Sequence, residues 1–121
     1  MSEIQDKIKS TIEGEPVVAF IKGTHEQVFC GNSMRALEAL RSVGASFTAV
    51  DVLPDPRIRQ ELSALSNWPT IPQVFVGGEL VGGADIVQEL AATGELEATL
   101  EDRLGSGWRD DRAEKTVSLN G

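Results

Sequence analysis

The chain has one cysteine, Cys30, and the position of this residue suits thiol chemistry. It follows a strand-like run, residues 17–21, and a short loop, and it precedes a helix-like run that starts at Gly31 and stops at Gly44. A cysteine placed there lies at or beside the N-cap, where unpaired backbone N–H groups and the positive end of the helix dipole stabilise a thiolate. A thiolate can attack a disulfide or bind a soft metal. The spacing therefore predicts that Cys30 is a nucleophile or a metal ligand.

Two further side chains that could assist this chemistry stand close to Cys30 in the sequence. Lys22 follows the strand-like run, so its ammonium can approach the sulfur and lower the thiol pKa. A lysine at a strand end is usually only solvated, but the cysteine that follows favours a functional role. His25 could act as a base or a metal ligand. Because Glu26 and Gln27 follow it, we interpret His25 as a solvated loop residue.

The composition limits the kind of protein that carries this thiol. A single cysteine among 121 residues cannot form a disulfide within the chain, so oxidised Cys30 must be joined to another chain or to a small thiol. The length and the hydrophobic content of 40% suit one domain with a modest core. The formal net charge is −8 and the basic residues are scattered, which argues against a nucleic-acid partner.

The chain carries no sequence signal for a membrane. No apolar run approaches the ~20 residues that span a bilayer. The N-terminus, Met1-Ser2-Glu3-Ile4, has no basic segment followed by an apolar one. We therefore expect a soluble, cytoplasmic protein without a membrane partner.

Apolar periodicity predicts the elements that hold Cys30 in place. Isoleucines at four-residue spacing behind a capping box predict a short N-terminal helix, residues 3–13. Residues 17–21 are continuously apolar, as in a central strand covered on both faces. A helix at 31–43 and a strand at 47–51 follow. This order predicts a parallel strand-helix-strand unit.

The next part of the chain predicts a helix and a hairpin. Asp55 and Pro56 open the helix, and residues 67–72 break it. Gly77 and Gly78 form a two-residue hairpin signal. The sequence therefore predicts two antiparallel strands on either side of them, at residues 73–76 and 79–81.

Two helices separated by Gly94 and ending at Leu104 complete the predicted domain, residues 1–104. Residues 105–121 show no sustained period, so we expect a disordered C-terminal tail. The predicted fold class is α/β, with a four-stranded mixed sheet, helices on both faces and an extra N-terminal helix. This is the outline of a thioredoxin-like fold.

A segment after the third helix could bind an extended ligand beside the thiol. Pro72 follows Ile71 at a tight junction between a helix and a strand. It is a candidate for a cis proline, or else a simple strand-starting proline. A cis proline would turn the backbone N–H and C=O of Ile71 outward, where they could pair with a peptide.

A second segment, Gly82 to Asp85, opens a helix. The free N–H groups at this helix start suit a carboxylate, and the side chain of Asp85 suits an ammonium. Ala84 and Asp85 therefore fit a zwitterion. An ordinary N-cap role for Asp85 is compatible with this interpretation.

Taken in order, four segments resemble the monothiol glutaredoxins, whose signature is Cys-Gly-Phe-Ser. A single such segment would be a weak signal, but their joint order and spacing are specific. The resemblance spans roughly residues 4 to 104 and implies a glutaredoxin fold. The matching pieces are Phe20-Ile21-Lys22-Gly23-Thr24, Cys30-Gly31-x-Ser33, Trp68-Pro69-Thr70-Ile71-Pro72-Gln73 and Gly82-Gly83-x-Asp85-Ile86.

The resemblance implies that the tripeptide glutathione binds beside the thiol. Pro72 would be cis, and Ile71 would pair with the middle of the tripeptide. Ala84 and Asp85 would hold its γ-glutamyl end, which carries a carboxylate and an ammonium.

The resemblance also implies a basic site for the other end of glutathione. Lys22 and Arg59 would hold the glycine carboxylate, since an arginine fork suits a carboxylate. Arg57 is an alternative to Arg59 that periodicity does not exclude.

Two residues depart from the family pattern within the site. Asn32 stands in the place of the signature phenylalanine, and its carboxamide can change the solvation and stability of a bound cluster. Ala84 stands where the family often has a cysteine. Without that second thiol, glutathione must resolve an oxidised Cys30.

The resemblance implies a main function in iron–sulfur cluster transfer and iron homeostasis. Cys30 of two chains and the thiolates of two glutathiones would hold one [2Fe–2S] cluster, which four thiolates complete. The protein would be a homodimer when loaded and a monomer when apo. Its partners would be iron–sulfur apoproteins and a histidine-containing protein.

Two other functions are less favoured. In the first, Cys30 removes glutathione from protein mixed disulfides, as an at most weak glutathione-dependent thiol-disulfide oxidoreductase. In the second, a cluster-free scaffold binds a partner through the edge formed by Trp68 and Pro72. The scaffold hypothesis predicts that Cys30→Ser retains function in cells.

Overall fold

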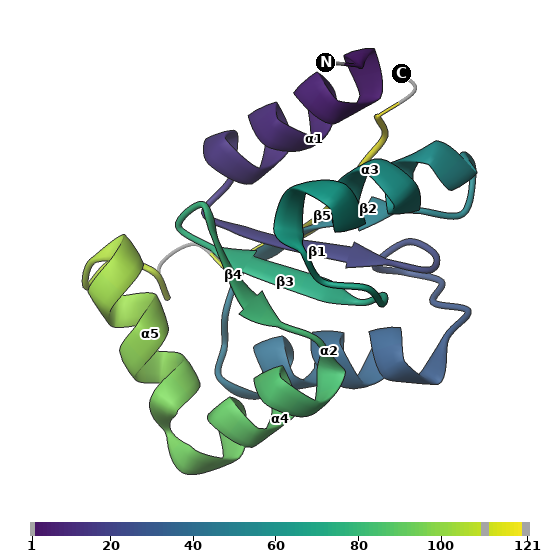
Figure 1. The fold of residues 1–121 in the computed structure, drawn as a ribbon. Helices are drawn as coiled ribbons and strands as arrows, with labels where there is room; N and C mark the ends of the chain where they lie inside the picture. Colours follow the sequence, from purple (N-terminus) through teal and green to yellow (C-terminus); the bar gives the residue numbers. More distant parts are fainter. Residues whose placement is uncertain (1, 110–111, 120–121) are drawn as a thin grey trace.

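A five-stranded mixed sheet with helices on both faces forms the body of the molecule (Figure 1). The structure is a computed structural model, and it describes residues 2–109 and 112–119. The strand order across the sheet is β4-β3-β1-β2-β5. In chain order the elements are α1 (Glu3–Gly14), β1 (Val17–Ile21), α2 (Gly31–Ser42), β2 (Phe47–Asp51), α3 (Pro56–Ser66), β3 (Gln73–Val76), β4 (Glu79–Gly82), α4 (Ala84–Thr93), α5 (Glu95–Leu104) and β5 (Glu114–Val117).

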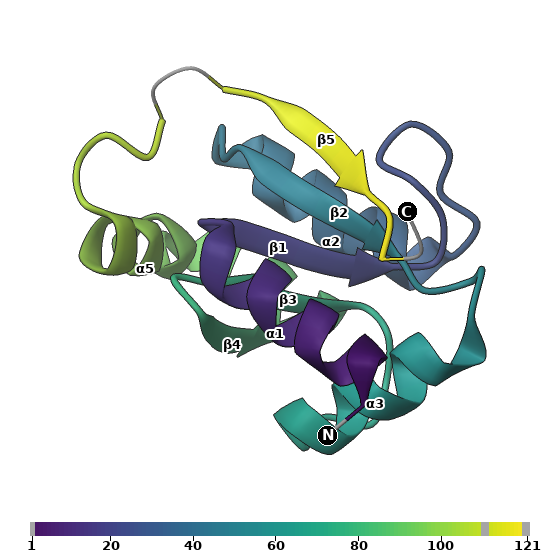
Figure 2. The same cartoon turned by 90° about the horizontal axis from the view of Figure 1, so that it is seen from above.

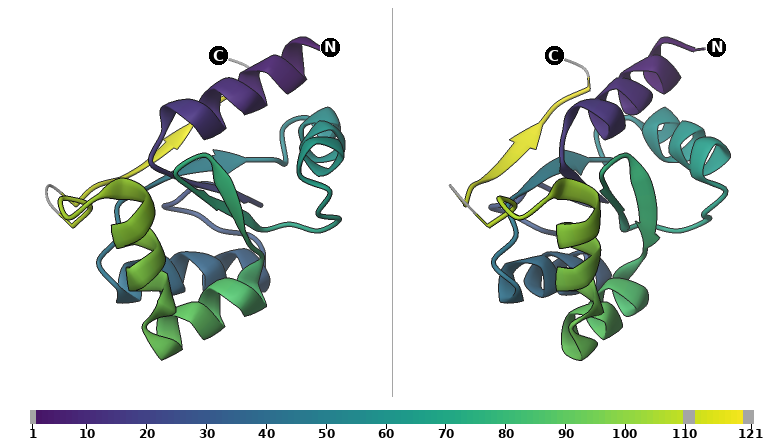
Figure 3. Two further views of the ribbon diagram at one scale, coloured as in Figure 1. Left: turned by 60° about the vertical axis from the view of Figure 1, so that its left-hand side comes forward. Right: turned by 90° about the vertical axis from the view of Figure 1, so that its left-hand side faces the viewer.

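The central strand β1 separates two hydrophobic clusters. All five of its residues are buried, which confirms the prediction of a strand covered on both faces. Val18 and Phe20 point to one face and pack with the buried residues of α1 and α3. Val17, Ala19 and Ile21 point to the other face and pack with residues of α2, α4 and α5. Figure 3 shows α1 and α3 on one side of the sheet and α2 and α4 on the other.

Local sequence signals account for the predicted helix start and hairpin. The Ser2 side chain accepts a hydrogen bond from the backbone N–H of Gln5 at 3.0 Å, as the capping box predicts. Gly77 and Gly78 have φ of 60° and 84°, the left-handed region that glycine adopts without steric cost. β3 and β4 are antiparallel on either side of this turn. β1 and β2 are parallel, so the predicted strand-helix-strand unit is confirmed.

The predicted count of four strands is wrong by one. β5 lies parallel to β2, with Phe47 opposite Glu114 and Val50 opposite Val117 (Figure 2). It comes from the segment that we expected to be disordered. The segment also contributes Trp108, which is 9% exposed and belongs to the α2 side of the core.

The sequence pattern missed β5 for a physical reason. A four-residue strand with the sequence Glu-Lys-Thr-Val has no apolar alternation, and its hydrogen bonds go to a strand far away in the chain. Positions 110–111 and 120–121 of the predicted tail lie outside the described residues. Of the helices that the structure describes, none is long and apolar enough to cross a membrane.

Candidate functional site

Cys30 is the N-cap of α2. Its backbone is extended, with φ of −134° and ψ of 129°, and its carbonyl accepts the N–H of Met34 at 2.9 Å, so the helix begins at the next residue. The side chain is half-buried. The sulfur therefore stands at the end of α2 where unpaired N–H groups stabilise negative charge.

The surroundings of the sulfur favour the thiolate. Partial burial by itself raises the pKa of Cys30, but hydrogen bonds outweigh this effect and the pKa is lowered from its ordinary value. The donors are the backbone N–H and the hydroxyl of Ser33 and the backbone N–H of Asn32. The charge of Lys22 lowers the pKa further, in the direction that the sequence predicts.

Ser33 has a role that the sequence analysis did not assign. It is fully buried, and its Oγ accepts the backbone N–H of Lys22 at 3.2 Å. Its hydroxyl proton can then be donated to the sulfur, so one side chain connects the end of β1 to the thiolate. Its place in the matched motif was the only available signal.

A groove of about 350 Å³ lies beside the start of α2. It brings together three predicted site residues, namely Ile71 from the loop before β3 and Ala84 and Asp85 from the first turn of α4. Asn32, two residues after Cys30, also lines it. The full lining is Asn32, Trp68, Thr70, Ile71, Pro72, Gly83, Ala84, Asp85 and Ile86.

The start of α4 lines this groove. Gly83 is the N-cap of α4, so no side chain of the N-cap residue accepts a hydrogen bond from the helix start. Its carbonyl accepts the N–H of Val87 at 3.0 Å. The N–H groups of Ala84 and Asp85 have no partner within the helix, because the first four donors of an α-helix never do. The helix therefore starts at Ala84, in the segment that we predicted to open a helix, and the binding of a carboxylate there stays a prediction.

The loop that forms the opposite wall is fixed by buried side chains. Gln73 is fully buried and donates from its amide to the carbonyls of Trp68 and Thr70, at 2.9 and 3.2 Å. A Cβ on Gly83 would come within 3.3 Å of Trp68 Nε1 and of the Pro72 carbonyl, so the two walls touch at this glycine. The Ile71–Pro72 peptide bond is cis, as the resemblance implies.

Arg35 joins the two helix starts of the site, and the sequence analysis missed it. Its guanidinium donates to Asn32 Oδ1 at 2.9 Å, to Asp85 Oδ1 at 2.6 Å and to Gln88 Oε1 at 2.7 Å. The carboxamide at the signature position therefore serves as an acceptor for Arg35. Nothing in the spacing of α2 indicates a contact with a residue 50 positions away.

The basic residues that we predicted at the glycine end of glutathione do not line the groove. Arg57 donates to the Asp55 carboxylate, with a shortest distance of 2.7 Å, so its fork is already used. Arg59 is exposed on α3 and, among the described residues, is not part of the groove lining. The structure therefore leaves Arg59 accessible but does not bring it to Ile71, Ala84 and Asp85.

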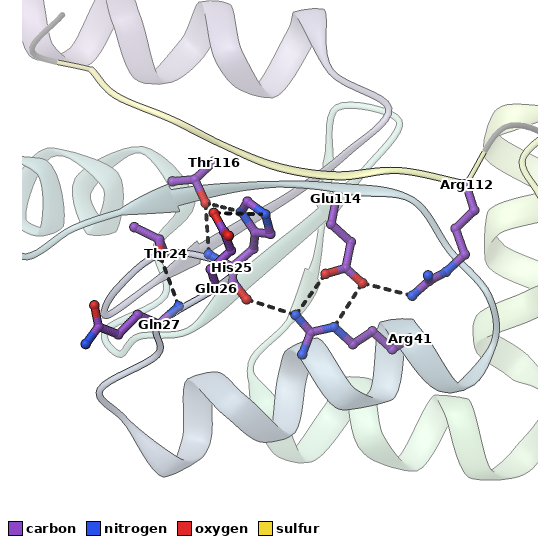
Figure 4. Close-up of polar contacts among 8 residues, drawn as sticks. All are labelled: Thr24, His25, Glu26, Gln27, Arg41, Arg112, Glu114 and Thr116. Carbon is purple, nitrogen blue, oxygen red and sulfur yellow. Dashed lines mark hydrogen bonds and ion pairs between the residues drawn. The ribbon is translucent and has the colours of Figure 1, made fainter.

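His25 is held by the C-terminal strand, which corrects our interpretation of a solvated loop residue (Figure 4). Its backbone N–H donates to Thr116 Oγ1 at 2.8 Å, and its ring Nδ1 lies 2.7 Å from the same oxygen. Its carbonyl accepts from Arg41 at 3.0 Å. The correction follows from β5, which supplies Thr116.

Glu114 of the same strand strengthens this attachment (Figure 4). Its carboxylate accepts two hydrogen bonds from Arg41, both at 2.9 Å, and one from Arg112 at 2.9 Å. The hydrogen bond from Arg41 lowers the pKa of Glu114, although partial burial opposes it. β5 and α2 thereby hold the loop between Lys22 and Cys30 from two sides.

The described residues hold no group of three or more His, Cys, Asp or Glu side chains placed to bind a metal ion. Cys30 is the only thiol in the sequence. A cluster bound at this site would therefore need further ligands from outside the chain.

Comparisons with known proteins agree with this geometry. Residues 17–81 match the family model described as Glutaredoxin. The chain is 48% identical over 100 residues to Glutaredoxin 4 of Pasteurella multocida, covering 83% of this chain and 92% of that protein. It is 46% identical over 99 residues to Monothiol glutaredoxin-S11 of Oryza sativa, covering 82% of this chain but only 20% of that longer protein.

Solved structures share the fold. Reduced apo GrxS14 of poplar is 35% identical, with a TM-score of 0.76, over 85% of this chain and 94% of that chain. A buckwheat glutaredoxin solved as a glutathione complex is 25% identical, with a TM-score of 0.72, over 82% of this chain and 88% of that chain.

Proposed function

Because this chain belongs to the glutaredoxin family, we propose that it is a monothiol glutaredoxin that carries a [2Fe–2S] cluster in cluster transfer and iron homeostasis. One observation carries the proposal. A thiol whose pKa is lowered at a helix start stands next to a groove that Ile71, Ala84 and Asp85 line. A cytoplasmic location is part of the proposal, since thiols stay reduced there.

Glutathione is the ligand that we propose for the groove. The free N–H groups at the start of α4 suit the γ-glutamyl carboxylate, and the side chain of Asp85 suits its ammonium. The backbone of Ile71 would pair with the middle of the tripeptide. Lys22 and Arg59 would attract the glycine carboxylate. The buckwheat relative solved with glutathione supports this assignment by analogy.

The cluster is the cargo of the proposed carrier. Each chain would supply one thiolate, from Cys30, and each bound glutathione would supply another. Two chains and two tripeptides thus complete the four-thiolate site. The protein would be a dimer when loaded and a monomer otherwise. Iron–sulfur apoproteins would receive the cluster, and a histidine-containing protein would be a further partner.

Anaerobic reconstitution with iron, sulfide and glutathione tests the carrier function. The chain should become a coloured dimer with the absorption of a [2Fe–2S] cluster, and Cys30→Ser should stay a colourless monomer. A colourless monomer from the unsubstituted chain would contradict the proposal.

The lowered pKa of Cys30 favours a second candidate function, deglutathionylation. The Cys30 thiolate would attack the glutathionyl sulfur of a mixed disulfide, and the substrate thiolate would leave. A second glutathione would then attack the Cys30 mixed disulfide, releasing oxidised glutathione and restoring the thiolate. Turnover of a glutathionylated protein tests this function, and absence of turnover in a chain that forms a cluster would exclude it.

A further inference from the structure

We propose that Arg35 is a specificity-determining residue of the groove. It occupies the carboxylate of Asp85 and so weakens the preference of the groove for a ligand with an N-terminal ammonium. The inference rests on the proposed function, because it concerns the γ-glutamyl end of the glutathione site.

The contacts of Arg35 place a positive charge where the ligand ammonium would bind. The shortest of them, 2.6 Å, runs from Nη2 to Asp85 Oδ1. The same nitrogen donates to Gln88 Oε1, and Nε donates to this oxygen as well, at 3.2 Å. Asp85 and Gln88 of α4 therefore hold the Arg35 guanidinium against the first turns of this helix.

Asn32 fixes the guanidinium from the other side. Its Oδ1 accepts from Arg35 Nη1 at 2.9 Å, and the two residues are three positions apart on α2. A phenylalanine at this position offers no such acceptor. Asn32, which stands in place of the signature phenylalanine, therefore helps to keep the Arg35 guanidinium on Asp85.

Exposure makes the exchange with a ligand feasible. The Asp85 side chain is 89% exposed and the Arg35 side chain 38% exposed, so an ammonium in the groove can reach the carboxylate. The ammonium must then share the Asp85 carboxylate with Arg35 or displace Arg35 from it. One exposed ion pair is exchanged for another, so the ammonium adds little net binding free energy.

The other parts of the site do not depend on Arg35. The N–H groups at the start of α4 and the backbone of Ile71 remain available to the ligand. Specificity is a difference of affinities, so masking one subsite reduces discrimination while binding persists. The chain should therefore accept tripeptide thiols that lack the amino group almost as well as glutathione.

An NMR titration of the reduced chain measures this discrimination even when binding is weak. The two ligands are glutathione and its des-amino analogue, glutaryl-cysteinylglycine, which keeps the thiol and both carboxylates. The dissociation constants for the unsubstituted chain should agree within about twofold. Arg35→Gln should bind glutathione about threefold more tightly and the analogue with unchanged affinity, as expected for one exposed ion pair.

Arg109→Gln is the matched control, because it also removes one positive charge and Arg109 pairs with Glu97 away from the groove. It should behave as the unsubstituted chain does. Unchanged affinities in Arg35→Gln would overturn the inference. Equal weakening of both ligands would overturn it too, since Arg35 would then bind the carboxylate. Absence of binding in every variant would instead contradict the glutathione site, and with it the proposed function.

Discussion

Three hydrogen-bond donors and one positive charge surround the sulfur of Cys30. Two are backbone N–H groups of the first turn of α2, one is the hydroxyl of Ser33, and the charge of Lys22 adds to them. These interactions are all stronger when the sulfur is charged. They lower the thiol pKa although partial burial opposes it.

Ser33→Ala should raise the pKa of Cys30, because it removes the hydroxyl donor and leaves the backbone donors in place. A hydrogen bond to a charged group contributes about 1.5–3 kcal/mol. The pH profile of Cys30 alkylation by iodoacetamide should therefore shift to higher pH, and the rate of the fully ionised thiolate should not fall, because the nucleophilicity of a thiolate increases with its pKa.

Ser42→Ala is the control for this measurement. Ser42 lies at the end of the same helix, and its hydroxyl donates to the Ala39 carbonyl at 2.7 Å. Its alkylation profile should match that of the unsubstituted chain. A profile of Ser33→Ala that does not move would mean that the hydroxyl has no role in stabilising the thiolate.

At this scale the sequence predicts residue types better than contacts. Cys30, Ile71, Ala84 and Asp85 were found from motifs, and the groove brings the last three together. Arg35 was missed because its partners Asp85 and Gln88 belong to another helix. Spacing within one element carries no information about such a pair.

At the scale of elements, β5 supports the loop that leads into Cys30. Thr116 binds the backbone and the ring of His25, and Glu114 binds Arg41 of α2 (Figure 4). The family model ends at residue 81, so the strand lies outside the matched segment. The loop is thus positioned by a part of the chain beyond that segment.

Thr116→Val should loosen this loop. The substitution keeps the β-branched shape but removes the oxygen that accepts the His25 N–H, so the amide of His25 should exchange with solvent about five- to tenfold faster, as expected for one hydrogen bond of about 1 kcal/mol. Hydrogen exchange followed by NMR gives the rate of each amide.

Thr99→Val provides the comparison, because Thr99 donates only to the Glu95 carbonyl within α5. It should leave the exchange of the His25 amide unchanged. Equal protection of His25 in Thr116→Val and in the unsubstituted chain would show that β5 does not hold the loop.

Elements with a strong local signal were predicted well. The isoleucine stripe of α1, the apolar run of β1 and the Gly77-Gly78 turn each specify their structure through neighbours in the chain. β5 has no such signal. Its place depends on hydrogen bonds to β2 and on side-chain contacts to residues far away in the sequence.

At the scale of the whole molecule, Trp108 ties the C-terminal segment to the main core. It is buried in the cluster that contains Val17, Leu37 and Leu100, and its indole N–H donates to Glu101 at 2.6 Å. Trp108 of the C-terminal segment thus shares the core of the domain. A single unfolding transition is expected.

Trp108→Ala should lower the free energy of unfolding by about 3 kcal/mol, the order of loss for a large buried side chain. Urea unfolding followed by circular dichroism measures it. Trp108→Phe keeps most of the volume and should lose less. A midpoint for Trp108→Ala equal to that of the unsubstituted chain would mean that the segment does not contribute to the core.

The central claim is that one thiolate per chain is completed by glutathione and by a second chain. Native mass spectrometry of the anaerobically reconstituted protein tests it most directly, because it weighs every component of the complex at once. The predicted result is a mass of two chains, one [2Fe–2S] cluster and two glutathiones, which is absent in Cys30→Ser. A loaded species with one chain, or a loaded dimer without glutathione, would contradict the account.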